Sequence, residues 1–224
     1  MNSLCFIPAK GRSLRLKKKN FLKIGGKELF VRAIEAAKNS KCFKKIIVSS
    51  EDKTILKIAK DYGALPVLRE KKLSKKDVRV KDVLKKFLKK DNTIYDNITM
   101  LMPTSPLRNS RHIKEAHNKF CSSNCKTLVS IKEFNFNPGM ALKIYRKKLI
   151  PFYGKKFKWK RENFFPKAYH FNGAIFIAEY KYFIKNFTFI DDQTIPYVMD
   201  EVSSIDVDTL EDLQLAEFYY NKTK

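Results

Sequence analysis

Leu4-Cys-Phe-Ile-Pro-Ala-Lys-Gly-Arg-Ser13 is an apolar run that opens into a small basic loop, and Leu-Arg-Leu-Lys-Lys-Lys-Asn20 follows it. The apolar residues predict a short buried strand that ends in a turn. In an α/β sheet, the loops at the carboxyl ends of the strands are where phosphates bind. Backbone N–H groups around Gly11 can surround an anion there, with Lys10, Arg12 and Lys19 adding positive charge. Taken alone, the stretch is equally consistent with a solvated basic loop.

Apolar strands alternate with amphipathic helices through the first two thirds of the chain, and a shorter series follows near its end. Strands are expected over residues 4–7, 45–49, 65–68, 97–102, 126–131, 172–177 and 203–208. Helices are expected over residues 28–37, 52–62, 77–89, 111–120, 179–186 and 209–220. This alternation predicts the α/β class, with a mostly parallel sheet and helices on both faces.

The segment from Glu133 to Lys167 interrupts this alternation. It is rich in lysine and aromatic residues and lacks helical periodicity, so we expect extended strands or long hairpins that leave the main sheet. Clustered exposed aromatic residues mark interfaces more often than free surface. This favours a small extended dimerisation arm over a nucleic-acid stacking platform of the same composition. We therefore expect one α/β domain, residues 1–132 and 168–224, with an arm, residues 133–167, inserted in it.

Composition narrows the functional classes only a little. The chain has 224 residues, 44% of them hydrophobic, which supports a real core. Its net charge of +24 is scattered over the expected helix faces, which favours a generally basic surface over one nucleic-acid stripe. We expect no signal peptide, because Lys10 soon interrupts the first apolar run, and no apolar run reaches about 20 residues. We expect a cytoplasmic protein without a membrane partner, whose four cysteines are reduced thiols without zinc spacing: Cys5, Cys42, Cys121 and Cys125.

Two aspartates near the end of the chain are the best candidates for a metal site. Asp206 and Asp208 flank Val207 where an expected strand meets the last helix. Alternation along an extended chain puts both carboxylates on the same side, where they can hold one divalent cation. The alternative is that Asp208 only helps to cap the helix. A neighbouring phosphate loop favours the metal site, because Mg²⁺ on nucleotide phosphates is commonly held by one or two carboxylates.

Several familiar signatures are missing from the sequence. There is no G-x-x-x-x-G-K-[ST] loop, and no G-x-G-x-x-G follows the first strand, which argues against a dinucleotide oxidoreductase. No Ser or Cys nucleophile stands in a recognisable elbow. Of the three histidines, only His170, just before Asn172 and Gly173, is a candidate site residue.

Five motifs occur in order over nearly the whole chain. They are Ile7-Pro-Ala-Lys-Gly-Arg-Ser with Lys19-Asn20, Ile47-Val-Ser-Ser-Glu-Asp52, Leu101-Met-Pro-Thr-Ser-Pro-Leu-Arg108, Asn172-Gly-Ala-Ile-Phe176 and Ile205-Asp-Val-Asp-Thr209. Together they resemble the acylneuraminate cytidylyltransferases, also called CMP-sialic acid synthetases. The resemblance implies a Rossmann-like fold, a homodimer with a swapped arm, and Mg²⁺ as cofactor. It implies the transfer of CMP from CTP to a nine-carbon keto-sugar acid, with release of pyrophosphate.

The resemblance also implies roles for residues of these motifs, and for Arg69, Arg161 and His170, which lie outside the motifs. The catalytic residues would be Lys10, Lys19 and Asp208, and Mg²⁺ would be held by Asp206 and Asp208. The implied nucleotide-binding residues are Ala9, Lys10, Gly11, Arg12, Ser13, Lys19, Asn20 and Arg69. The implied sugar-binding residues are Met102, Thr104, Ser105, Arg108, Arg161, His170, Asn172 and Phe176.

Some positions depart from the family pattern. Lys10 and His170 stand where arginine is usual, Met102 where glutamine is usual, and Lys76 near a usual aspartate beside the base. The phosphate and metal residues match the pattern, whereas the sugar and base residues are altered. We therefore expect a variant nonulosonic acid, of the legionaminic or pseudaminic type, to be preferred over sialic acid.

Two alternative functions are left open. A cytidylyltransferase for the eight-carbon acid Kdo usually continues its first loop as Arg-Leu-Pro-Gly-Lys-Pro, and only Arg15 and Leu16 match that run here. A non-catalytic basic protein that binds nucleic acid through the aromatic, lysine-rich arm is the alternative from another class. It leaves the ordered motifs and the aspartate pair unexplained.

Overall fold

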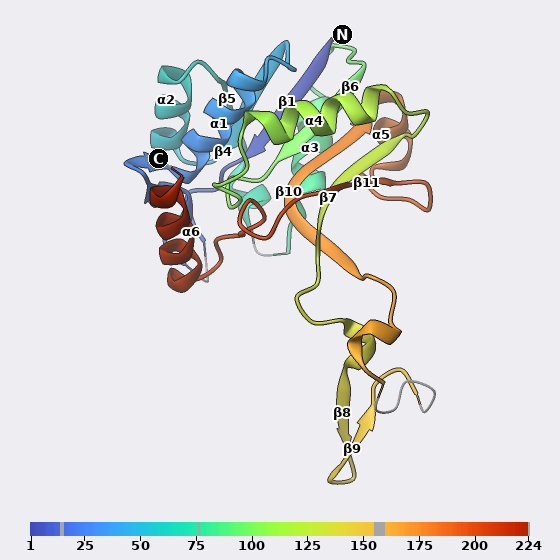
Figure 1. Ribbon diagram of the computed structural model, residues 1–224. Helices are drawn as coiled ribbons and strands as arrows, with labels where there is room; N and C mark the ends of the chain where they lie inside the picture. Colours follow the sequence, from blue (N-terminus) through green and yellow to red (C-terminus); the bar gives the residue numbers. More distant parts are fainter. Residues whose placement is uncertain (14–15, 76, 155–159, 224) are drawn as a thin grey trace.

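A seven-stranded sheet forms the body of the computed structural model, which describes residues 1–13, 16–75, 77–154 and 160–223 (Figure 1). In spatial order its strands are β11 (Ile195–Val198), β7 (Thr127–Glu133), β10 (Tyr169–Glu179), β6 (Asn97–Leu101), β1 (Ser3–Pro8), β4 (Lys45–Ser50) and β5 (Leu65–Leu68). Only β10 runs antiparallel to its neighbours; the other pairs are parallel. The expected mostly parallel sheet is confirmed.

Apolar clusters cover both faces of this sheet. Along β1, Leu4 and Phe6 belong to one cluster and Cys5 and Ile7 to the other, as the alternation of a strand requires. Helices α1 (Leu29–Ser40), α2 (Lys53–Asp61) and α4 (Ser110–Cys121) pack on the face that contains Cys5. Helices α3 (Val80–Leu88) and α5 (Tyr180–Asn186) pack on the other face. The expected helices on both faces are therefore confirmed.

The last helix, α6 (Leu210–Lys222), packs beside the loop that follows β1. It begins with a capping box, in which the Asp212 amide donates to the Thr209 hydroxyl and the Thr209 amide donates to the Asp212 carboxylate. Its buried Ala216 packs with Val207 and with Ile24 of the small hairpin β2 (Lys23–Ile24) and β3 (Lys27–Glu28). This packing fixes the Asp206–Asp208 segment next to the basic loop.

One expectation about the last third of the chain is wrong, and one strand there was not predicted. Residues 203–208 do not form a strand: they are irregular, and the Val207 amide donates to the Thr104 carbonyl oxygen at 2.8 Å. The strand there is β11, further upstream. It has only four residues, one of them Pro196, and it lies at the edge of the sheet, so its sequence pattern is too short to be recognised.

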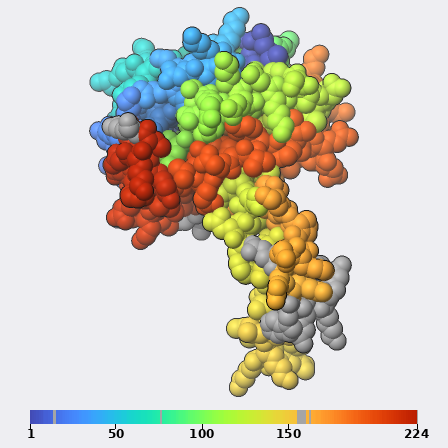
Figure 2. All heavy atoms as spheres, in the orientation of Figure 1, coloured from blue at the N-terminus to red at the C-terminus, as the bar shows by residue number. Residues whose placement is uncertain are grey.

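Between β7 and β10 the chain leaves the body as an arm, seen at the bottom of Figures 1 and 2. It contains the hairpin β8 (Leu142–Tyr145) and β9 (Lys148–Pro151) and short 3₁₀ turns, consistent with the expected hairpins. Ile144 and Leu149 face each other across this hairpin, yet they are 78% and 59% exposed. The arm thus presents apolar surface that its own chain does not cover.

No helix within the described ranges is long and apolar enough to cross a bilayer. The remaining short elements are the 3₁₀ turns η1 (Lys19–Phe21), η2 (Lys71–Ser74), η3 (Pro138–Met140) and η5 (Glu162–Phe164). Of these, η1 and η2 flank the cavity described next.

Candidate functional site

A cavity of about 280 Å³ opens at the edge of the sheet where β1 and β6 end. This edge is the phosphate-binding edge of an α/β fold. The basic loop, the segment after β5, the loop after β6 and the irregular segment before α6 all contribute to its lining. Nine residues expected from the sequence meet there: Lys10, Ser13, Lys19, Asn20, Arg69, Met102, Thr104, Asp206 and Asp208.

The basic loop is held by its own side chains and by the neighbouring strand. The Ala9 amide donates to the Ser49 carbonyl oxygen at 3.0 Å, so Ala9 extends the pairing of β1 and β4 and is itself buried. Asn20 donates from Nδ2 to the Lys10 carbonyl oxygen at 2.7 Å. Ser13 donates from its hydroxyl to the Leu16 carbonyl oxygen. These bonds fix the loop in front of the cavity.

The backbone amides of Gly11 and Arg12 bind an acidic side chain, so they do not form the open anion site that the sequence predicts. Their amides donate to Glu51 Oε1 at 2.9 and 3.4 Å. A Cβ atom at Gly11 would lie 2.6 Å from Asp52 Oδ2, so the close approach of the two loops requires glycine. Both residues line an adjoining cavity of about 390 Å³ that shares Ser74 with the first.

Glu51 also binds Arg69, another residue expected to bind the nucleotide. Its Oε2 accepts from Arg69 Nε at 3.1 Å, from Arg69 Nη2 at 2.9 Å and from the Ser74 hydroxyl at 2.6 Å. Burial raises the pKa of Glu51, but the hydrogen bonds from Ser74, the backbone and Arg69 outweigh burial, so the pKa is lowered. Burial lowers the pKa of Arg69. This ion pair therefore ties the basic loop to the segment after β5.

Sequence reasoning missed Glu51 as a site residue, although it belongs to one of the five motifs. Its signal is positional: Glu51 directly follows β4, and the basic loop directly follows β1. Because β1 and β4 are parallel neighbours, their carboxyl ends meet at the same edge. Ser74 and Lys75 were missed for another reason, since the lysine-rich stretch after β5 carries no recognisable pattern.

The two aspartates face the cavity together, although no strand positions them. Val207 is fully buried on the opposite side, and so its neighbours Asp206 and Asp208 both line the cavity. Asp208 Oδ1 accepts a hydrogen bond from Lys19 Nζ at 2.7 Å. The cavity walls displace water from the Asp206 carboxylate and raise its pKa, and the negative charge of Asp208 raises it further, against a hydrogen bond from the Thr104 side chain.

This donor set fits a magnesium ion. Within the described ranges no group of three or more His, Cys, Asp or Glu side chains is placed to hold a metal. Mg²⁺ needs fewer, because it keeps several waters and binds one or two carboxylates together with substrate phosphates. Burial is the largest cause of the raised pKa of Asp206, and the charge of Asp208 adds to it, so a cation between the two carboxylates would offset this repulsion.

Most of the residues expected to bind the sugar do not line this cavity; Met102 and Thr104 are the exceptions. Ser105 is buried, and Arg108 Nη1 donates to the carbonyl oxygens of Met102 and Ala174 at 3.0 and 3.2 Å. Asn172 is buried between the hydroxyls of Ser130 and Ser204, at 2.6 and 2.8 Å. The Phe176 ring packs 6.0 Å from that of Phe189, against α5.

The two remaining sugar-binding candidates lie at or on the arm. His170, at the base of the arm, pairs in register with Lys132, and its ring centre is 4.5 Å from that of Phe134. Arg161 is exposed on the arm itself. Lys76 lies outside the described residues. In a single chain, the structure therefore gathers most nucleotide candidates and both metal candidates, but only two of the sugar candidates, Met102 and Thr104.

Comparison with known proteins decides the family. Residues 4–224 match the model of a family described as cytidylyltransferase.

The chain belongs to this family.

It is 32% identical to the pseudaminic acid cytidylyltransferase of Campylobacter jejuni (strain 81-176) over 225 residues, which cover 98% of this chain and 97% of that protein. It is 34% identical to the N-acylneuraminate cytidylyltransferase of Streptococcus agalactiae (strain NEM316), over 95% of this chain and 52% of that longer protein. The expected family and the expected class of enzyme, a nucleotidyltransferase, are confirmed.

A solved structure supports the fold independently. The CMP:2-keto-3-deoxy-manno-octonic acid synthetase, solved in complex with CTP, superposes with a TM-score of 0.74 over the whole of both chains. Its sequence is only 13% identical, so this likeness shows the Rossmann-like fold alone. The Kdo enzyme thus resembles this chain in fold alone, whereas the pseudaminic acid and N-acylneuraminate enzymes resemble it in sequence.

Proposed function

We propose that this cytidylyltransferase transfers CMP from CTP to a nine-carbon nonulosonic acid, forming the CMP-sugar and releasing pyrophosphate. One observation carries the proposal: Lys10, Lys19, Asp206 and Asp208 meet in one cavity at the phosphate-binding edge of the sheet. The sequence relatives support the acceptor class, since they are named for pseudaminic acid and for N-acylneuraminate.

The reaction exchanges one bond at the α-phosphorus of CTP. The anomeric hydroxyl of the sugar attacks the α-phosphorus of CTP, a new P–O bond forms, and the bond to pyrophosphate breaks as the hydroxyl proton is released. Positioning and charge neutralisation account for most of the catalysis of such transfers. Lys19 supplies positive charge to the α-phosphate, and its bond to Asp208 Oδ1 orients the ammonium group. Lys10 and Ser13 face the same cavity and bind the outer phosphates.

Asp206 and Asp208 would hold the Mg²⁺ ion that these residues fit. When bound, Mg²⁺ supplies a divalent charge that offsets the negative charge of the phosphates. Glu51 has a structural part: it holds the Gly11 and Arg12 amides, so the loop is in place before nucleotide arrives. Arg69, fixed by the same carboxylate, lines the cavity for the base side of CTP.

We also propose that two copies associate through the arm. The exposed apolar side chains of β8 and β9 favour such an interface. A second observation agrees: Arg161 belongs to this arm and is not part of the lining of the cavity in its own chain, although the family resemblance assigns it to the sugar. The cytoplasmic location stays a prediction from the sequence.

The decisive experiment measures pyrophosphate release from CTP and Mg²⁺ with pseudaminic, legionaminic, sialic and Kdo sugars. Release with a nonulosonic acid, fastest with the pseudaminic or legionaminic type, is the expected result. Release with Kdo alone, or equal release without any sugar, would contradict the proposal.

A thermal unfolding series tests the nucleotide step separately. CTP should raise the melting temperature when Mg²⁺ is present and much less in its absence. A melting temperature that responds to nucleic acid, in a strongly salt-dependent way, and not to CTP would favour the basic-protein alternative.

A further inference from the structure

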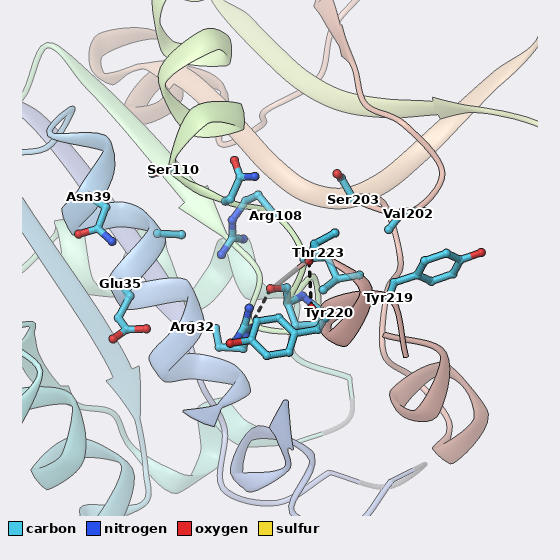
Figure 3. A pocket seen from close by; sticks show the side chains of 14 residues that line it. Arg32, Glu35, Asn39, Arg108, Ser110, Val202, Ser203, Tyr219, Tyr220 and Thr223 are labelled. Carbon is cyan, nitrogen blue, oxygen red and sulfur yellow. Dashed lines mark hydrogen bonds between the residues drawn. The ribbon is translucent and has the colours of Figure 1, made fainter. Parts of the chain in front are cut away.

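A second cavity, of about 350 Å³, lies away from the first, between α1, the loop before α4 and the C-terminal helix α6 (Figure 3). Its polar lining includes Arg32, Asn39, Arg108, Ser110, Ser203 and Tyr220. The proposed reaction gives this cavity no role, although Pro106, Leu107 and Arg108 of the third motif belong to its lining. Two of its lining side chains, Arg32 and Arg108, carry positive charge.

Arg108 is a buried cation that has no anionic partner among the residues that the structure describes. It is 2% exposed, its Nη1 bonds only carbonyl oxygens, and its Nε has no hydrogen-bond partner among the described residues. Burial lowers its pKa, Cys5 opposes this, and the charge of Arg32 lowers the pKa further, to about 10. The guanidinium therefore stays charged at neutral pH. A buried charge without a counter-ion is costly, and a bound anion would remove that cost.

Arg32 presents a second guanidinium to the same cavity. It donates from Nε to the Pro106 carbonyl oxygen and from Nη1 to the Ile24 carbonyl oxygen, both at 3.1 Å. Its Cζ lies 4.3 Å from the centre of the Tyr220 ring, and Figure 3 shows the two side chains against each other. The group is thus held in place from three sides. Glu35 lines the cavity as well, but it pairs with Lys27 at 2.5 Å.

We propose that this cavity binds the phosphate group of a small metabolite. Two guanidiniums that line one cavity suit a phosphate, which offers several acceptor oxygens. The first turn of α4, beginning at Ser110, adds the positive end of a helix dipole. The volume of about 350 Å³ leaves room for an organic part next to the hydroxyl of Ser203 and the amide of Asn39.

The cavity shares a loop with the catalytic one. Met102, Pro103 and Thr104 line the catalytic cavity, and the next residues, 106–110, line the second. Arg108 joins the two, because its Nη1 bonds the Met102 carbonyl oxygen. An anion that offsets the repulsion between Arg32 and Arg108 would therefore stabilise the loop that presents Met102 and Thr104. Phosphate binding does not depend on the proposed function; only this coupling to turnover rests on it.

The binding test is calorimetric titration of the full chain with inorganic phosphate, with and without saturating CTP. CTP blocks phosphate binding in the catalytic cavity, so binding that persists with CTP reports the second cavity. Arg32→Gln and Asn39→Glu should each weaken this binding at least tenfold. Asn39 is exposed, so its replacement keeps the fold even if Arg32→Gln does not. Arg111→Gln is the control, because it removes an equal charge from an exposed site outside the cavity.

The proposal is overturned if CTP abolishes all phosphate binding, or if Asn39→Glu binds phosphate as tightly as the control. Binding of acetate as tight as that of phosphate would also overturn the assignment to a phosphate group. For the coupling, phosphate should lower the KM for the sugar at least twofold in wild type and Arg111→Gln, but not in Asn39→Glu. An unchanged KM with phosphate bound would overturn the coupling. A chain that binds phosphate with neither CTP binding nor turnover would refute the proposed function and leave the second site standing.

Discussion

The nucleotide side and the sugar side of this enzyme differ in how their residues are brought together. On the nucleotide side, motifs that lie almost 190 positions apart meet in one cavity, as the Lys19–Asp208 bond of 2.7 Å shows. On the sugar side, Asn172 and Arg108 are buried in hydrogen bonds within the body, and Arg161 lies on the projecting arm.

Topology explains this difference. Parallel strands such as β1 and β4 end at the same edge, so whatever follows them converges within one chain. The strand β10 runs antiparallel, and the residues before it lead out along the arm. On our proposal, a pocket that includes the arm is completed by a second copy, whereas the cavity that holds the nucleotide candidates lies within one chain.

The largest expected effect is on the nucleotide side, from Asp208→Ala. It removes one proposed metal ligand and the partner of Lys19, so turnover should fall about 10³-fold, equivalent to about 4 kcal/mol of activation free energy. Because Asp208 lies at the surface of the cavity, the melting temperature should change little. Steady-state pyrophosphate release and thermal unfolding measure the two effects. Glu211→Ala, an exposed acid in the next helix, is the control and should keep its activity; a near-normal rate in Asp208→Ala would refute the metal assignment.

Lys19→Ala should have the next largest effect. Its charge is proposed to act on the transition state, so kcat should fall about 10²-fold while the affinity for CTP falls much less. Nucleotide titration and single-turnover rates separate these two quantities. The control is Lys17→Ala, which removes an exposed lysine two positions away. Equal losses in binding and in rate would mean that Lys19 only binds the ground state.

Glu51→Gln tests whether the buried ion pair positions the loop. The amide keeps the shape but leaves Arg69 without its counter-charge, so we expect a loss of about 2 kcal/mol in unfolding free energy. The KM for CTP should rise roughly tenfold with little change in kcat, because the loop and Arg69 are both loosened. Urea unfolding and steady-state kinetics measure these effects, with the exposed Glu70→Gln as control. A stable variant with an unchanged KM would show that the pair does not hold the loop.

The pH dependence of stability gives an independent check on the same pair. The pKa of Glu51 is lowered in the folded chain from its ordinary 4.5, so the unfolded chain binds the proton more readily. The stabilisation is therefore complete above about pH 4.5 and is lost as the pH falls through the lower, folded value. The stability difference between wild type and Glu51→Gln should shrink over that acidic window. A difference that stays constant there would argue against an ionic origin.

The same contrast shows what sequence reasoning can reach. Alternation along β1 and the periodicity of the helices predicted the sheet and its two covered faces, because burial imposes both patterns. The convergence of the Lys19 and Asp208 motifs was predictable, because the end of β1 and the start of α6 are recognisable in the sequence. Arg108 and Asn172 could not be separated from site residues by motif, since the same polar side chain can bind a ligand or satisfy buried backbone groups. Recognising Glu51 as a site residue requires the order of the strands in the sheet, which a single sequence does not contain.

The smallest effect on catalysis is expected from the arm, and it tests the sugar side. Ile144→Glu puts a charge on the exposed apolar face of β8, so a dimer held by this face should dissociate, as light scattering would show. If the arm of one copy completes the sugar pocket of the other, the KM for the sugar should rise several-fold while the KM for CTP stays constant. Lys147→Glu, at the turn of the same hairpin, is the control for added negative charge. A monomeric Ile144→Glu with normal sugar kinetics would place the whole sugar pocket within one chain. The two sides would then differ in how deeply their residues are buried, and not in whether a second copy is required.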